Sequence, residues 1–240
     1  MRTLLIGIFL LLLCIASLIL APIAFIMRKI NLKKSRSFSY KLVRFYCIVI
    51  LKLAGTKVKV TGTENIPDGP VLFIGNHSSY LDIPLGFSKI KGKELVFISK
   101  IEMKKVPLVN TWLYLIGSLY LDRKNIKEGL KTILQGIEEL KNGYSIFVFP
   151  EGTRSKDGKL LPFKEGTMKL AEKSGAPIVP VVITNSSHIF ERQAPWVKKA
   201  HVTMTFAKPI YVKDLTGDDK KFTARYVQTI MEGILEEQNK

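Results

Sequence analysis

The sequence VLFIGNHSSYLD, residues 71–82, indicates a buried strand, a polar turn and the start of a helix. Four apolar residues open the stretch, as expected of a strand inside a sheet. Gly75, Asn76 and two serines then favour a turn. Pro84 has no N–H group and fits only the first turn of a helix, so we expect the next helix to begin near Asp82.

His77 and Asp82 lie five positions apart in this stretch. On one continuous helix their side chains would point about 140° apart and would not meet. A strand–turn–helix corner lets Asp82 accept from one imidazole nitrogen, while the other nitrogen takes a proton from a hydroxyl. Two alternatives stay open, in which Asp82 only caps the helix or His77 is a loop histidine without a chemical role.

The charge of the 240-residue chain is strongly basic and unevenly placed. The formal net charge is +17, and eleven basic residues but no acidic residue precede Glu64. Such a surface suits an anionic membrane or a nucleic acid. Because it directly follows an apolar segment, we expect anionic membrane lipid as the partner and no nucleic acid.

Cysteine and histidine are too few for a metal centre. Cys14 and Cys47 lie in apolar surroundings without metal-ligand spacing, and the histidines are His77, His188 and His201. We therefore expect neither a disulfide framework nor a metal site.

Residues 3–27 form an uncharged apolar run of 25 residues. The run is longer than the apolar part of a signal peptide and lacks a convincing cleavage site, so we expect it to be retained. It is long enough to cross a bilayer. Because six basic residues follow it within 28–41 and only Arg2 precedes it, a spanning helix would leave the rest of the chain in the cytoplasm.

A second mode of membrane attachment is also open. Pro22 interrupts the apolar run, and residues 38–54 have the pattern of a second, amphipathic and basic helix. Such a helix suits the plane of an anionic membrane surface. The sequence thus predicts membrane-attachment helices over residues 1–54, which either span the bilayer or dip into one leaflet.

From residue 55 the pattern changes to short strands that alternate with helices. We expect strands at 57–60, 71–74, 95–98, 118–121, 145–149, 178–183 and 202–206, and helices near 82 and at 107–116, 126–137, 167–174 and 222–234. This alternation predicts an α/β domain over residues 55–240, with a mostly buried central sheet flanked by helices.

Polar residues follow four of these strands. His77, Lys100 and Arg123 come after the first three, and Glu151-Gly152-Thr153-Arg154 comes after the fourth. Ligands of α/β sheets bind beyond the carboxyl ends of the strands, and arginine holds phosphate through two parallel hydrogen bonds. We therefore expect a shared site for a phosphate-bearing substrate, in which Gly152 lets a backbone N–H approach an oxyanion.

These residues also have purely structural explanations. Arg123 would pair with Asp122 or a helix end, and Glu151 would pair with Arg154.

Four motifs resemble those of the glycerolipid acyltransferase family. NHSSYLD at 76–82 is similar to its HX4D motif, and GSLYLDR at 117–123, FPEGTRS at 149–155 and VPVVI at 179–183 are similar to the next three. They occur in the order of the family. The chain resembles most the lysophosphatidic acid acyltransferases (1-acyl-sn-glycerol-3-phosphate acyltransferases), which convert lysophosphatidic acid to phosphatidic acid.

The resemblance implies a mechanism. His77, oriented by Asp82, would deprotonate the free hydroxyl of lysophosphatidic acid, which then attacks the thioester of acyl-CoA or acyl-carrier protein. It implies no acyl-enzyme and no cofactor besides this donor. Backbone amides near Gly152 or Asn76 would meet the oxyanion.

The resemblance also implies substrate-binding residues and a location. The acceptor's phosphate would be held by Arg123, Arg154 and Lys100, and Glu151, Gly152 and Thr153 resemble the acceptor-binding loop of the family. Such an enzyme would sit on the cell membrane with its catalytic domain on the cytoplasmic side.

Two other functions stay open. One is an acyltransferase that uses glycerol 3-phosphate or another lysophospholipid. The other is a non-enzymatic binder of anionic membranes or nucleic acid, which would leave the spacing of His77 and Asp82 unexplained.

Overall fold

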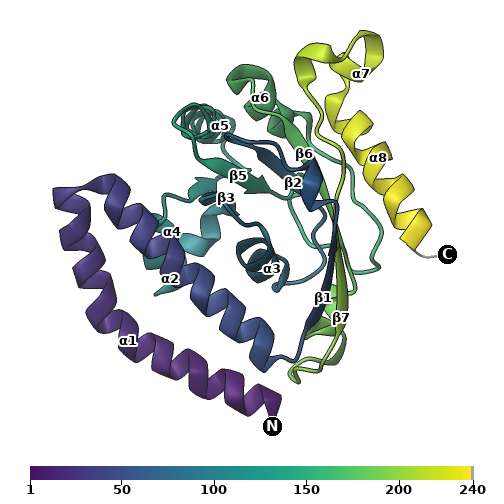
Figure 1. Cartoon of the computed structure of the whole chain (residues 1–240). Coiled ribbons are helices and arrows are strands. Elements are labelled where there is room, and N and C mark those ends of the chain that lie inside the picture. The colour runs from purple at the N-terminus through teal and green to yellow at the C-terminus, as the bar shows by residue number, and fades with distance from the viewer. Residues whose placement is uncertain (239–240) are drawn as a thin grey trace.

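A central sheet of seven strands lies between helices on both of its faces in the computed structural model, which describes residues 1–238 (Figure 1). The strands are β1 (Lys57–Thr61), β2 (Leu72–Gly75), β3 (Leu95–Lys100), β4 (Leu119–Leu121), β5 (Ser145–Val148), β6 (Ile178–Thr184) and β7 (His201–Phe206). The helices are α1 (Arg2–Ile30), α2 (Leu32–Leu53), α3 (Asp82–Lys89), α4 (Val109–Leu115), α5 (Ile126–Lys141), α6 (Glu165–Ser174), α7 (Gly217–Lys221) and α8 (Thr223–Gln238). The predicted α/β class is confirmed. Residues 239 and 240, the end of the predicted domain, lie outside the described residues.

The strand order is β1-β7-β6-β2-β5-β3-β4. All neighbouring strands run parallel except β6 and β7, which are antiparallel. The neighbours β2, β5, β3 and β4 therefore end at one edge of the sheet. This edge is where the sequence placed His77, the Glu151–Arg154 loop, Lys100 and Arg123.

Alternate residues of the central strands enter two different cores. Phe73 of β2 packs in a core closed by α2 and α3, whereas Leu72 and Ile74 pack in a core closed by α5, α6 and α8. These three side chains are fully buried. Side chains of a strand alternate between the faces of its sheet, so apolar runs such as 71–74 are needed where both faces are covered.

The two N-terminal helices differ from the expected pattern. Helix α1 continues through Pro22 without a break. Helix α2 begins at Leu32 and not near residue 38, because Asn31 caps it by accepting a 2.9 Å hydrogen bond from the N–H of Lys34.

Helices α1 and α2, here called the N-terminal pair, pack side by side against the α/β domain (Figure 1). Near one end of α1, Thr3 Oγ1 accepts a 2.9 Å hydrogen bond from the N–H of Val197. Farther along, Ser17 Oγ accepts a 3.0 Å hydrogen bond from Trp112 Nε1 of α4. The domain therefore holds α1 at two points along its length.

A partly buried ion pair adds a further link between the N-terminal pair and the domain. Arg36 of α2 donates two hydrogen bonds, of 3.1 and 2.8 Å, to the carboxylate of Glu139 on α5. Arg36 is only 6 % exposed, and its guanidinium also lies over the Tyr144 ring at 3.7 Å. Two parallel hydrogen bonds between a guanidinium and a carboxylate restrict how the two groups are oriented, so this pair fixes α2 against α5.

Candidate active site

The turn between β2 and α3 is held by side chains from elsewhere in the chain. Strand β2 ends at Gly75 and α3 begins at Asp82, as expected. Between them, Asn76 donates a 2.8 Å hydrogen bond to the carbonyl oxygen of Ile183 and accepts a 2.7 Å bond from the N–H of the same residue. Asn76 thus acts as a bridge to β6 and positions the residues that follow it.

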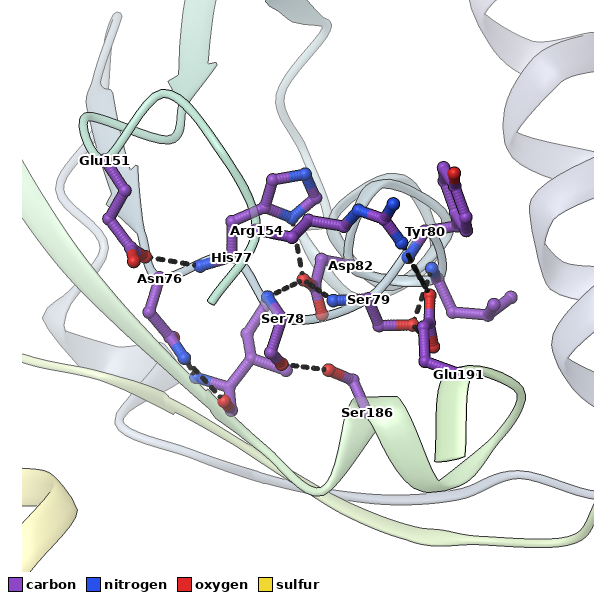
Figure 2. Close-up of polar contacts among 12 residues, drawn as sticks. Asn76, His77, Ser78, Ser79, Tyr80, Asp82, Glu151, Arg154, Ser186 and Glu191 are labelled. Carbon is purple, nitrogen blue, oxygen red and sulfur yellow. Dashed lines mark hydrogen bonds and ion pairs between the residues drawn. The ribbon is translucent and has the colours of Figure 1, made fainter. Parts of the chain in front are cut away.

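His77 and Asp82 meet within this turn, as the strand–turn–helix corner predicted. The distance from His77 Nδ1 to Asp82 Oδ2 is 2.9 Å, and the Asp82 side chain is fully buried (Figure 2). The same oxygen accepts 2.8 Å hydrogen bonds from the N–H groups of Ser78 and Ser79. The alternative that Asp82 only caps α3 is wrong, since these amides precede the helix.

The imidazole of His77 has one engaged and one available nitrogen. A carboxylate can only accept, so the contact with Asp82 places the ring proton on Nδ1. Within residues 1–238, Nε2 has no hydrogen-bond partner, and the side chain is 16 % exposed. The ring stacks on Phe149, with centroids 4.1 Å apart and planes at 15°. This arrangement leaves Nε2 with a lone pair that can accept a proton.

Glu151 joins the β2–α3 turn to the loop after β5. Its Oε1 accepts a 2.7 Å hydrogen bond from the N–H of His77, and its Oε2 accepts a 3.0 Å bond from the N–H of Leu161. Burial raises the pKa of this carboxyl to about 7, although the two N–H donors act in the opposite direction and the charge of Asp82 adds to the rise. Glu151 does not pair with Arg154, so that structural alternative is wrong.

Arg154 pairs with Glu191, a residue to which the sequence drew no attention. Arg154 Nη1 lies 3.4 Å from Glu191 Oε1, and its guanidinium carbon lies 3.6 Å from the centre of the Tyr80 ring. Glu191 also accepts hydrogen bonds from Ser79 and Tyr80 (Figure 2). No local pattern marks Glu191, because it stands in a short helix, Glu191–Gln193, outside the four motifs.

Arg123 reaches the same loop from the end of β4. Gly152 has a φ of +76°, and a Cβ atom there would lie 2.9 Å from the guanidinium carbon of Arg123. Glycine therefore provides room for the guanidinium at this position. Asp122 accepts from the backbone N–H groups of Lys124 and Asn125, and it forms no ion pair with Arg123 among residues 1–238. Partial burial lowers the pKa of Arg123 from its ordinary value.

Three expectations for this edge of the sheet need correction or stay without support. The N–H of Gly152 donates to the carbonyl oxygen of Phe149 at 3.1 Å, so this amide is already engaged in a turn and is no free donor to an oxyanion. Lys100 and Thr153 are exposed, and within the described chain neither side chain makes a hydrogen bond or ion pair. The structure therefore brings together His77, Asp82, Glu151, Gly152, Arg123 and Arg154, but leaves these two side chains exposed.

Comparisons with known proteins agree with the motifs. The profile of the family described as Acyltransferase matches residues 57–184, which is more than half of the chain. The 1-acyl-sn-glycerol-3-phosphate acyltransferase of Saccharomyces cerevisiae is 36 % identical over 196 residues, covering 80 % of this chain and 64 % of the yeast protein. That of Borreliella burgdorferi is 35 % identical over 153 residues, covering 63 % and 61 %. The chain thus spans less than two thirds of the length of these relatives.

A solved structure is similar over almost the whole chain. It is the 1-acyl-sn-glycerophosphate (LPA) acyltransferase, PlsC, from Thermotoga maritima, with a TM-score of 0.75 and 27 % identity. The match covers 98 % of this chain and 97 % of the Thermotoga chain. Together with the profile match and the four motifs around the His77–Asp82 turn, this similarity shows that the chain belongs to the acyltransferase family.

Proposed function

We propose that this protein transfers a fatty acyl group from acyl-CoA or acyl-carrier protein to the free hydroxyl of lysophosphatidic acid, giving phosphatidic acid. The observation that carries the proposal is the 2.9 Å contact between His77 and the buried Asp82, which leaves imidazole Nε2 without a partner among residues 1–238. The names of the similar proteins, which refer to 1-acyl-sn-glycerol-3-phosphate, support this acceptor.

In the proposed reaction, Nε2 of His77 takes the proton of the lysolipid hydroxyl as its oxygen attacks the thioester carbonyl carbon. Asp82 remains ionised and stabilises the imidazolium that forms. The tetrahedral intermediate then collapses, the C–S bond breaks, and the leaving thiolate takes the proton back from His77. Acyl-CoA or acyl-carrier protein enters as a substrate, so the reaction needs no metal or further cofactor.

In this proposal two arginines near the loop after β5 bind the phosphate of the acceptor. Arg123 lies against Gly152 and Arg154 lies over the Tyr80 ring, and each offers a planar set of donors that matches phosphate oxygens. In this proposal Glu151 fixes the loop through its hydrogen bond with His77, and the exposed Lys100 at the end of β3 attracts the anion.

The N-terminal pair gives the proposed enzyme access to lipid. Helix α1 is apolar, with a mean hydropathy of 3.1 over 18 residues of which only 11 % are buried. The lysolipid and the acyl chain of the donor both favour the bilayer over water. Each buried CH₂ of an acyl chain favours the bilayer by about 0.8 kcal/mol. Attachment through the basic N-terminal pair to the cytoplasmic face of the cell membrane would keep the site close to these substrates.

The contacts of α1 favour attachment to one leaflet over a span. Thr3 and Ser17 bind side chains or backbone of the α/β domain, so α1 would have to detach from Val197 and Trp112 before it could cross a bilayer. Its outer face exposes large apolar residues to the surroundings, among them Leu4, Leu11, Leu12, Ile15, Leu18, Ile19, Ile26 and Ile30. A helix lying in the membrane plane would bury this face in acyl chains.

The experiment that tests the activity is an acceptor panel with labelled acyl-CoA and acyl-carrier protein as donors. Purified protein would be given lysophosphatidic acid, glycerol 3-phosphate and lysophosphatidylcholine in turn, with His77→Ala as the inactive control. We expect labelled phosphatidic acid as the main product. A preference for glycerol 3-phosphate would mean that this compound, and not lysophosphatidic acid, is the acceptor. Absence of thioester cleavage with every acceptor would refute the proposed function.

A further inference from the structure

The carboxylate of Glu191 lies between two parts of the site, the β2–α3 turn and Arg154. Its Oε2 accepts a 2.8 Å hydrogen bond from the hydroxyl of Ser79, and its Oε1 accepts a 2.6 Å bond from the N–H of Tyr80 (Figure 2). These contacts join positions more than 110 residues apart in the sequence. Glu191 therefore fixes the turn from outside the motif that forms it.

Ser79 passes this constraint on to the His77–Asp82 pair. The N–H of Ser79 donates a 2.8 Å hydrogen bond to Oδ2 of Asp82, the same oxygen that meets His77. Ser79 is fully buried, so water cannot replace the carboxylate at its hydroxyl. Loss of Glu191 would leave this hydroxyl without its acceptor and loosen the backbone that holds Asp82.

Arg154 meets the same carboxylate from the substrate side. The Nη1 to Oε1 distance of 3.4 Å is long for an ion pair with a hydrogen bond, and the two side chains are 33 % and 19 % exposed. Tyr80 supports the guanidinium through its ring at 3.6 Å. A phosphate that binds Arg154 must compete with the negative charge of Glu191.

We propose that Glu191 is a positioning residue that holds the His77–Asp82 turn and limits the affinity of Arg154 for the phosphate of the acceptor. This inference rests on the proposed function, because it assigns a phosphate to Arg154. The product carries the same phosphate as the acceptor, so a carboxylate beside Arg154 also favours product release. Glu191 touches no reacting atom in this scheme.

Two substitutions separate the two effects. Glu191→Ala removes both, and we expect kcat to fall about tenfold or more. Glu191→Gln keeps an oxygen that accepts from the N–H of Tyr80 and retains a side-chain contact with Ser79 Oγ, whose direction reverses because the amide donates where the carboxylate accepted, and it removes the charge. We expect this variant to retain kcat within about threefold, to lower the KM for lysophosphatidic acid by about three- to tenfold, and to leave the donor KM unchanged.

The coupling to Arg154 is tested in a second background. In Arg154→Ala protein, Glu191→Gln should no longer lower the acceptor KM, because the guanidinium that it releases is absent. Glu172→Gln is the matched control, since it removes one carboxylate from an exposed ion pair on α6. This control should leave both kinetic constants unchanged.

Each result decides the inference. Wild-type kcat in Glu191→Ala, or a wild-type acceptor KM in Glu191→Gln, would overturn it, and the second measurement stands even where the alanine variant does not fold. If wild-type protein acylates no acceptor, the proposed function fails separately. In that case the positioning role of Glu191 is tested by NMR of the His77 ring. Glu191→Gln or Glu191→Ala should shift the ring resonances, and Glu172→Gln should not.

Discussion

The backbone N–H of His77 donates a 2.7 Å hydrogen bond to Oε1 of Glu151, which joins the first motif of the site to the third. The other carboxylate oxygen of Glu151 holds the N–H of Leu161, so one buried side chain fixes two loops. Glu151 stands in the loop after β5, and its side chain reaches the turn after β2. Glu151 thus organises the backbone around His77.

The pKa of Glu151 predicts a pH dependence of stability. Burial raises this pKa from 4.5 to about 7, so the folded protein binds a proton that the unfolded chain has lost between these pH values. The free energy of unfolding should therefore decrease as the pH rises from about 4.5 to 7, by on the order of 2 kcal/mol from this group. Urea unfolding at pH 4.5 and pH 7.5 measures the decrease.

Glu151→Gln removes this titration and should flatten the pH profile relative to the wild type. Its single acceptor oxygen leaves one of the two N–H groups unpaired, so the comparison concerns the change with pH and not the absolute stability. Glu172→Gln keeps Glu151 and should retain the wild-type profile. An equal change with pH in wild type and Glu151→Gln would contradict the assignment.

His77→Ala should abolish transfer without unfolding the protein. Removing a general base lowers the rate by about 100- to 10,000-fold, and Asp82→Asn should also lose at least about 100-fold because the amide cannot stabilise the imidazolium. Single-turnover kinetics with saturating lysophosphatidic acid measures the loss, and circular dichroism checks the fold. A His77→Ala protein with near wild-type turnover would remove the base assignment.

Arg154→Ala should raise the KM for the acceptor more than the KM for the donor. A charge-assisted hydrogen bond contributes about 1.5–3 kcal/mol, which corresponds to roughly ten- to hundredfold in KM. Arg154→Lys keeps the charge without the planar pair of donors and should fall between alanine and wild type. A larger effect on the donor KM would place Arg154 in the donor site.

Gly152→Ala should lower both stability and acceptor binding. The +76° φ angle is strained for alanine and costs about 1–2 kcal/mol, and the new Cβ would displace Arg123. Gly158→Ala is a matched control, because Gly158 has a φ of +81° but no atom within 4 Å of the place that a Cβ would take. The Gly158→Ala control should lose stability, measured by thermal unfolding, but keep the wild-type KM for the acceptor. An unchanged acceptor KM in Gly152→Ala would show that Arg123 does not bind the phosphate of the acceptor.

The fluorescence of Trp196 should report membrane attachment in the plane of one leaflet. Trp196 is 63 % exposed and lies in an apolar groove with Leu4 and Ile8 of α1, whereas Trp112 is buried. Vesicles of phosphatidylglycerol should shift its emission to shorter wavelength as the indole enters the interface. Trp196→Phe protein should bind the vesicles without this shift. Co-sedimentation of the wild type without a shift would speak against in-plane attachment.

Local features of the sequence were sufficient for the seven strands, for most of the helices and for the His77–Asp82 pair, although α7 was not predicted. Apolar runs such as 71–74, and the placement of Gly75 and Pro84, restrict the backbone over a few residues, so strand, turn and helix could be predicted there. The same local geometry brings an imidazole and a carboxylate five positions apart into contact. The start of α2 was missed because the cap at Asn31 depends on a single side-chain contact.

Only the tertiary structure decided which distant residues complete the site and how α1 lies. Glu191 reaches Ser79 across 112 positions, and Arg36 reaches Glu139 across 103. Such contacts depend on the order of the strands and the packing of helices on the sheet, for which no short stretch of sequence carries a signal. The apolar composition of α1 could be read from the sequence, but its placement follows from the hydrogen bonds that Thr3 and Ser17 make with the folded domain.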